Sequence, residues 1–269
     1  MSFRFPAFAL LSAVAATLTA PAALAQYTVK VGGAYIDPHA TSTPLRGGVA
    51  VPSPLGGNLV LNDGVALQVQ TQHTVIFAIE RALSDRWSVE FVLGTPPQHD
   101  VKLKVDNPQI DASKVTPGAA PISAGAAQVA ATNGLKAKLA AQNGQVISTV
   151  RQWAPTVFFN YRFLDPSSAF RPFVGLGINV TRFKARTTAG GDTLYADGAR
   201  PEISLSDSIG PAVQVGASYK LDRNWSINAS VATAKVDNKL TIKTASGLRQ
   251  ESSFRFNPTA LTATVGYSF

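Results

Sequence analysis

The segment LTATVGYSF (261–269) alternates apolar residues with small or polar ones. Its apolar positions are Leu261, Ala263, Val265, Tyr267 and Phe269. A period of two is typical of a β-strand with two different faces. Chain termini are usually frayed and polar, so an apolar face that continues through this segment must lie against another apolar phase.

The first 25 residues predict a targeting segment that is removed on export. Arg4 supplies a positive start, residues 7–20 form an uncharged apolar stretch, and Ala-Leu-Ala at 23–25 is a small-x-small cleavage signal. We expect the mature chain to begin near Gln26. A transmembrane anchor is the weaker alternative, because the apolar stretch is short and strand-like sequence follows it at once.

Composition restricts the partners and the chemistry. The chain has 24 Lys and Arg against 16 Asp and Glu, a net charge of +8 that becomes +7 without Arg4. The basic residues are scattered, which argues against nucleic acid and favours anionic lipid head groups and lipopolysaccharide as partners. With no cysteine and with His39, His73 and His99 lacking the spacing of a metal site, we expect neither a metal nor another cofactor.

Eight segments show strand character, and short and long connections alternate strictly between them. The segments are 27–36, 73–81, 87–94, 153–163, 170–183, 211–221, 225–236 and 254–269. Antiparallel up-and-down strands joined in this way place the short turns at one end and the long loops at the other. The pattern predicts an all-β fold, an eight-stranded antiparallel up-and-down barrel.

Alternation alone also fits a soluble sandwich or a lipocalin-like barrel. Two observations favour a transmembrane β-barrel. Aromatic residues gather near the short-turn end of the apolar faces, as in a membrane-interface girdle: Trp87, Tyr161, Phe163, Tyr219, Trp225, Tyr267 and Phe269. The opposite faces carry too many polar groups for a dry core. Since no 18-residue apolar run follows residue 25, helical spans are excluded, and we predict a bacterial outer-membrane barrel with periplasmic turns and extracellular loops.

Several stretches resemble the OmpW family of outer-membrane proteins, which has AlkL-like members. They are FRPFVGLGINVTRF (170–183), SIGPAVQVGASYKLDRNWSINASV (208–231), the ending VGYSF and GTPPQHDV (94–101), which is similar to the family's Thr-Pro-x-x-His stretch. The chain departs from the family at Ser230, where an acidic residue is usual, and in an Ala/Gln-rich insert at about 110–149. Barrels of this length are commonly single domains, so we predict one barrel domain, 26–269, with a loop insert at about 95–152. The resemblance implies an eight-stranded barrel as well. It also implies passage of small hydrophobic molecules across the lipopolysaccharide leaflet, with lateral exit into the membrane.

The inward-facing residues differ with height in the barrel. Near the short turns five charged residues come from five strands, and we predict an ionic plug because an unpaired buried charge is too costly: Lys30, Glu80, Glu90, Arg162 and Lys220. Toward the long loops the inward residues are apolar: Ile36, Ile76, Val92, Phe158, Phe183, Val236 and Phe256.

An apolar mouth above an ionic plug does not fit a general aqueous pore. It fits passive passage of a small hydrophobic solute that leaves through the wall, where inward glycines and Pro155, Pro172, Pro211 and Pro258 weaken strand pairing. The alternative is a structural or receptor barrel with a filled lumen and functional extracellular loops.

We expect no enzyme, because His73 is the only histidine in a strand and no Gly-x-Ser-x-Gly elbow occurs. His99 is expected to be a solvated loop residue.

Residues 134–144 fit either a short amphipathic helix or a flexible loop, and TASG (244–247) predicts a hairpin turn. Val265, Tyr267 and Phe269 also resemble the terminal signal that barrel assembly machinery recognises, so that machinery is an expected partner.

Overall fold

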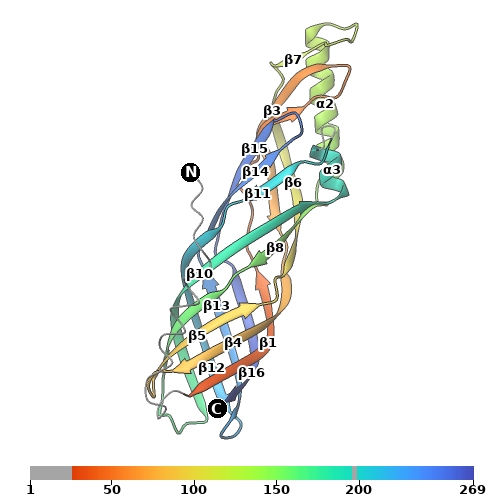
Figure 1. The fold of residues 1–269 in the computed structure, drawn as a ribbon. Coiled ribbons are helices and arrows are strands. Elements are labelled where there is room, and N and C mark those ends of the chain that lie inside the picture. The colour runs from red at the N-terminus through yellow and green to blue at the C-terminus, as the bar shows by residue number, and fades with distance from the viewer. Residues whose placement is uncertain (1–25, 196–198) are drawn as a thin grey trace.

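The computed structural model describes residues 26–195 and 199–269, so the expected targeting segment lies outside the described residues. Eight antiparallel strands form a closed barrel (Figure 1). In barrel order they are β1 (Tyr27–Asp37), β4 (Gln72–Ala82), β5 (Trp87–Gly94), β9 (Thr156–Arg162), β10 (Phe170–Thr187), β12 (Ser208–Lys220), β13 (Trp225–Ala234) and β16 (Thr259–Ser268). β16 then pairs with β1 and closes the ring. The predicted fold class is confirmed.

The seam between the first and last barrel strands is fully paired. The register runs from Thr28 opposite Ser268 to Asp37 opposite Thr259. Below it, the N–H of Tyr27 donates to the Phe269 carbonyl at 3.2 Å and the N–H of Phe269 donates to the Tyr27 carbonyl at 3.0 Å. Segment 261–269 is therefore the closing strand of the barrel.

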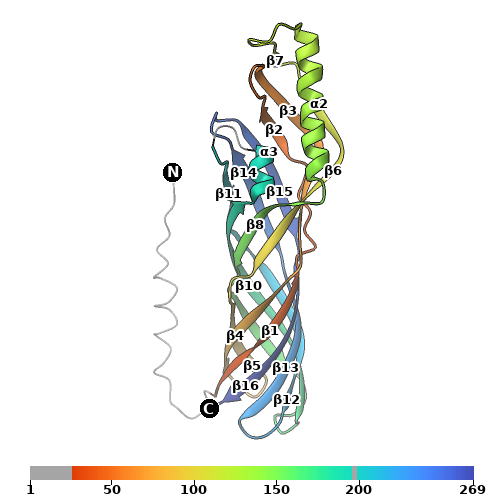
Figure 2. The same ribbon diagram turned by 90° about the vertical axis from the view of Figure 1, so that its right-hand side faces the viewer.

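The long connections do not remain loops but form a second antiparallel sheet beyond the barrel (Figure 2). Its strands are β11 (Glu202–Leu205), β14 (Val236–Lys243), β15 (Arg249–Phe256), β2 (Arg46–Ala50), β3 (Gly56–Val69), β6 (Gln98–Asp111), β8 (Val146–Trp153) and the outer part of β10. A short β7 (Val115–Thr116) pairs with β3. We call this the extracellular sheet, after the end of the barrel from which it rises. The predicted hairpin at 244–247 is confirmed as the turn between β14 and β15.

Two helices lie against the extracellular sheet: α2 (Ala124–Gln142) and α3 (Ala189–Tyr195). Ser123 caps α2, because its hydroxyl accepts a hydrogen bond from the N–H of Ala126 at 3.2 Å. The buried residues of α2 recur every four positions and form one apolar stripe: Ala127, Ala131, Leu135 and Leu139. The helical alternative for 134–144 is therefore the observed one, in a longer helix. None of the helices within 26–195 and 199–269 is long and apolar enough to cross a membrane.

The outer face of the barrel exposes large apolar side chains. Leu176 and Ile209 are 71% and 75% exposed, and aromatic rings cluster near the short turns, with the Trp87 and Phe159 centroids 4.7 Å apart. A protein surrounded by water seldom exposes so much contiguous apolar surface. This band matches the lipid-facing surface of a membrane barrel.

The buried apolar core lies in the extracellular sheet rather than in the barrel. Leu45, Leu59, Val65, Leu103 and Ile147 are among its most buried members. The barrel interior instead buries many polar side chains, including Ser88, Asn160 and Thr181. The two halves of the molecule are thus stabilised by different interactions, apolar packing above and hydrogen bonds with ion pairs below.

Replacement of Gly32 by alanine should weaken barrel closure. A Cβ at Gly32 would lie 2.0 Å from the Ala263 carbonyl oxygen, so β1 and β16 would have to separate. Gly33→Ala is the matched control, since its Cβ would lie 4.0 Å from the nearest atom, a Thr74 oxygen. We expect Gly32→Ala to lower the free energy of unfolding by about 1–3 kcal/mol in a urea titration in detergent. Equal stability of the two variants would contradict this account of the seam.

Candidate functional site

A buried ion cluster closes the lower part of the barrel lumen. Lys30 Nζ lies 2.7 Å from both Glu80 Oε2 and Glu90 Oε1, and Arg162 Nη2 lies 2.6 Å from Glu80 Oε1. The side chains of Lys30, Glu80 and Glu90 are buried. Two cations and two carboxylates therefore balance one another, as buried charges require. We refer to these four residues as the ion cluster.

Amides complete the hydrogen bonding of the ion cluster. Asn160 and Gln214 both donate to Glu90 Oε2, at 3.0 and 2.9 Å, and Gln214 Nε2 also lies 2.7 Å from Asn160 Oδ1. Ser88 donates to Glu80. Gly175 leaves the space for these amides, because a Cβ there would lie 2.1 Å from Asn160 Oδ1. Neither amide was predicted as part of the plug, because the one signal in the sequence was a polar residue at an inward position.

Lys220 was wrongly assigned to the plug. It is the last residue of β12, its side chain is exposed, and its Nζ donates to the Pro166 carbonyl at 2.7 Å. It lines a wide vestibule of about 720 Å³ on the short-turn side of the ion cluster, together with Arg171. Arg171, which the sequence analysis overlooked, is buried and donates through Nη2 to the Asp85 carbonyl at 2.5 Å.

Above the ion cluster lies a mid-barrel cavity of about 130 Å³. Four of the residues expected to form an apolar lumen line it: Ile36, Ile76, Phe158 and Val236. Small side chains such as Ala34 and Ala212 line the remaining wall and keep the cavity open. The cavity is thus lined mostly by apolar groups, and no charged residue of the described chain lines it.

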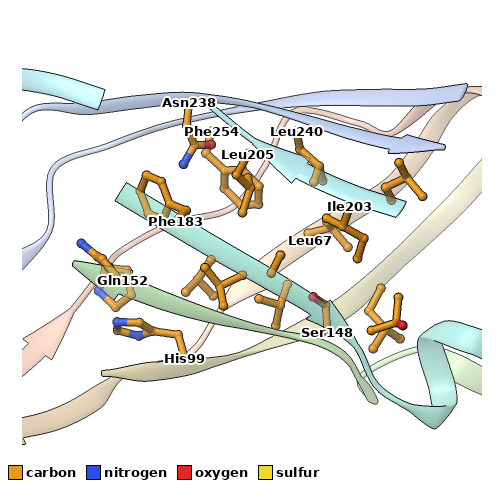
Figure 3. A pocket seen from close by; sticks show the side chains of 18 of the residues that line it. Leu67, His99, Ser148, Gln152, Phe183, Ile203, Leu205, Asn238, Leu240 and Phe254 are labelled. Atoms are coloured by element: carbon orange, nitrogen blue, oxygen red, sulfur yellow. The ribbon is translucent and has the colours of Figure 1, made fainter. Parts of the chain in front are cut away.

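A second, narrow cavity of about 50 Å³ lies within the extracellular sheet (Figure 3). We call it the upper pocket. Phe183 and Phe256 line it, as does Gln152, which also lines the mid-barrel cavity. Gln152 therefore forms part of the wall of both cavities. Val92, a half-buried residue of β5, lines neither cavity, although it lies opposite Thr156, which lines the mid-barrel cavity.

His99 was also predicted wrongly, as a solvated loop residue. It is the second residue of β6 and is only 1% exposed. Its Nδ1 lies 2.9 Å from the Gln70 carbonyl oxygen, and burial lowers the pKa of the imidazole below its ordinary value. The residue is buried because the Thr-Pro-Pro segment before it leads directly into the extracellular sheet.

Strand pairing is interrupted at the outer rim of the barrel wall. Pairing of β5 with β9 ends at Val92 and Thr156, and pairing of β6 with β8 begins at Gln98 and Arg151. Between these points the described residues show one backbone hydrogen bond across the break, from the N–H of Gln152 to the Pro97 carbonyl at 3.1 Å. Prolines at 96, 97 and 155 have no N–H to donate there. We call this break the wall gap.

The mid-barrel cavity reaches the wall gap. Gly94, Pro97 and Ala154, which flank the break on both sides, line the cavity. Of the prolines that the sequence analysis associated with weak pairing, Pro155 lies at this gap. In the described residues 26–195 and 199–269, no group of three or more His, Cys, Asp or Glu side chains is placed to hold a metal ion.

Removal of the central lysine should destabilise the barrel strongly. Lys30→Met would leave two buried carboxylates with one cation between them, so we expect the free energy of unfolding to fall by about 3–5 kcal/mol. Lys220→Met is the control, and its effect should stay within about 0.5 kcal/mol because that lysine is exposed. Urea titration of both variants in detergent micelles measures the difference. Comparable losses in the two variants would contradict the ion cluster as the main internal support.

Comparison with known proteins places the chain in a family. The model of the OmpW family matches residues 122–269. Outer membrane protein W of Escherichia coli (strain K12) is 37% identical over 123 residues, which is 46% of this chain and 56% of that protein. The chain thus aligns with little more than half the length of the curated relatives it matches.

Solved structures share the fold. The crystal structure of OprG from Pseudomonas aeruginosa has a TM-score of 0.65 at 19% identity, covering 91% of this chain and 96% of that one. The solid-state NMR structure of AlkL in lipid bilayers has a TM-score of 0.53 at 17% identity, covering 100% and 97%. Together with the closed barrel and its apolar outer band, the match to the family model shows that this chain is an outer-membrane β-barrel protein of the OmpW family.

Proposed function

We propose that this protein gives small hydrophobic molecules passive passage across the outer leaflet of the outer membrane. The observation that carries the proposal is the stacking of two apolar-lined cavities above a closed ion cluster. A molecule from outside would move through the upper pocket, pass Gln152 and enter the mid-barrel cavity. This direction agrees with what the family resemblance implies.

The ion cluster supports a route that does not continue straight through the barrel. Lys30, Glu80 and Glu90 are buried and mutually bonded, and Asn160 and Gln214 fill the remaining hydrogen-bonding positions. An apolar solute cannot replace these bonds, so entering the cluster would leave charged groups unpaired. The cluster therefore acts as the floor of the path.

The wall gap supports lateral exit into the membrane. The backbone groups of a membrane barrel must be paired because lipid offers no partners, and the gap is the place where β5 and β9 lose this pairing next to the mid-barrel cavity. Prolines on both sides remove donors that would otherwise require a partner. An apolar solute loses no hydrogen bonds on moving from this cavity into lipid.

Charged substitutions in the cavity walls test the passage. Phe158→Arg in the mid-barrel cavity and Phe256→Arg in the upper pocket would place a cation on the path. We expect each to slow the uptake of alkanes or small aromatics by cells expressing the protein about tenfold or more, because the solute would have to displace a hydrated charge. Val129→Arg is the control, since Val129 is exposed on α2 and lies far from both linings.

Folding of each variant is first verified by heat-modifiable gel mobility. Uptake by folded Phe158→Arg and Phe256→Arg at the rate of Val129→Arg would exclude the conduit. That result would favour the structural or receptor barrel with a filled lumen.

We also propose that lipopolysaccharide binds the outer surface of β10 and β8. Lys184 and Arg151 are exposed and lie directly opposite each other in the register, with Arg182 and Arg186 on the same face of β10. Like charges directly opposite on a sheet destabilise it, so an anion between them would relieve the repulsion. The phosphates of the leaflet that surrounds this end of the barrel supply such anions.

Lys184→Glu tests whether lipopolysaccharide binds at this surface or is attracted only by the overall surface charge. We expect it to weaken the binding of purified lipopolysaccharide to the detergent-solubilised protein about tenfold. In lipopolysaccharide-free detergent it should instead raise thermal stability, because a carboxylate would then face Arg151. Lys239→Glu, an exposed lysine on β14, is the control. Unchanged affinity in Lys184→Glu would exclude this surface as the binding site.

Barrel assembly machinery is the remaining proposed partner. Val265, Tyr267 and Phe269 are exposed on the outer face of the closing strand, and the Phe269 backbone pairs with Tyr27. Val265 and the aromatic Tyr267 and Phe269 would thus be read by this machinery before folding, and all three residues pair with the first strand segment in the folded barrel.

A further inference from the structure

We propose that the upper pocket selects hydrophobic molecules that carry a hydrogen-bond donor, such as alkanols and phenols, over hydrocarbons and ethers of the same size. The selecting residues are His99 and Asn238. This inference rests on the proposed function, because it names the class of molecule that the same path admits. It is carried by residues that line a mostly apolar pocket and whose buried polar atoms have no partner in the described part of the chain.

The geometry fixes the proton on His99. Nδ1 lies 2.9 Å from the Gln70 carbonyl oxygen, which can only accept a hydrogen bond, so Nδ1 carries the proton and donates. Burial lowers the pKa of the ring and favours its neutral form. Nε2 therefore presents a bare lone pair, and it has no hydrogen-bond partner among the described residues.

Asn238 supplies a second acceptor from the opposite side of the pocket. Figure 3 shows His99 coming from β6 and Asn238 from β14, with the pocket between these two walls. The Asn238 side chain is buried, and its Oδ1 has no partner in the described chain. A buried acceptor left unpaired is costly, so a ligand that donates to it recovers this cost.

A third polar atom, the Tyr195 hydroxyl, is buried in the same lining without a described partner. Burial raises the pKa of this phenol, so it remains neutral and can accept or donate. All three groups are uncharged. The pocket is therefore suited to a neutral ligand with a small polar group and not to an ion.

The rest of the lining accommodates the apolar part of such a ligand. Leu67, Val101, Ile147, Leu205 and Phe254 contribute aliphatic and aromatic surface. The cavity is narrow, about 50 Å³, so the lining side chains would have to shift to admit a six-carbon chain. A hydroxyl can donate to His99 or Asn238, whereas an ether oxygen can only accept a hydrogen bond and, like an alkane, leaves both of these acceptors unpaired.

The test compares isomers that differ in the donor alone. Binding of 1-hexanol and of methyl pentyl ether to the detergent-solubilised protein is measured by NMR, with ¹⁵N-labelled histidine reporting on His99 Nε2. We expect wild type to bind hexanol about threefold to tenfold more tightly than the ether and to show the Nε2 shift of an accepted hydrogen bond with hexanol alone. His99→Leu and Asn238→Leu should each reduce this preference, and His73→Leu, an exposed histidine on β4, should retain it.

Uptake of both isomers by expressing cells is measured as well as binding. It separates the selection in the upper pocket from the proposed passage through the barrel. The selection would be overturned, and the conduit left in place, if the protein took up both isomers, bound them with equal affinity and showed no change in His99→Leu or Asn238→Leu. Absence of protein-dependent uptake of either isomer would overturn the conduit. Should His99→Leu fail to fold, Asn238→Leu and the wild-type Nε2 shift still decide the outcome.

Discussion

The whole structure depends on the requirement that backbone groups in lipid find partners within the protein. β16 meets it by pairing with β1 along its length, and hydroxyl pairs reinforce the barrel on the inner face, Thr28 with Ser268 at 2.8 Å and Ser230 with Thr262 at 2.7 Å. β10 continues from the barrel into the extracellular sheet and so fixes the position of one on the other. The wall gap lies at the rim, where pairing passes from one sheet to the other.

Closure also determines the unusual distribution of polarity. A barrel that faces lipid must place its apolar side chains outside, so its lumen receives the polar ones. A charged lumen is stable only if its charges neutralise one another, which the Lys30, Glu80, Glu90 and Arg162 contacts achieve. The extracellular sheet is free of this constraint, and it packs an ordinary apolar core. The apolar pocket accordingly lies above the membrane barrel and the ionic floor within it.

Much of the barrel could be predicted from the sequence, because lipid on one side and a polar lumen on the other impose a strict period of two. The bounds of β5, Trp87–Gly94, match the prediction, and β1 extends one residue beyond it. Of the extracellular sheet, the sequence predicted the hairpin of β14 and β15 but not the other strands, which are irregular. β3, for example, has two register shifts around Asn62-Asp63-Gly64, and these break the alternation. The helix α2 was left undecided because alanine dominates it.

The site was less predictable than the fold, since it depends on distances across the lumen. Inward charge identified Lys30, Glu80, Glu90 and Arg162, but Gln214 joins them from β12, which does not pair with β5 or β9. Only the closed geometry brings side-chain atoms from these strands within 3 Å of one another, and a side chain at a strand end, such as that of Lys220, can turn away. His99 was missed for a related reason, because its burial depends on a sheet that the alternation did not reveal.

The upper pocket, the mid-barrel cavity and the ion cluster follow one another along the barrel axis. Their order would favour movement of a small hydrophobic solute in one direction, from outside toward the wall gap. In the upper pocket it would exchange water for apolar side chains and for a few neutral acceptors. In the mid-barrel cavity mostly small and apolar groups surround it, and the ion cluster below offers it no compensating contact. The free energy of an apolar solute in lipid beyond the wall gap is no higher than in the cavity. The solute would therefore meet no energetic penalty on leaving into the membrane. The ion cluster would therefore direct transport without ever binding the solute, because the lateral route leaves its ion pairs intact and the route straight through the barrel does not.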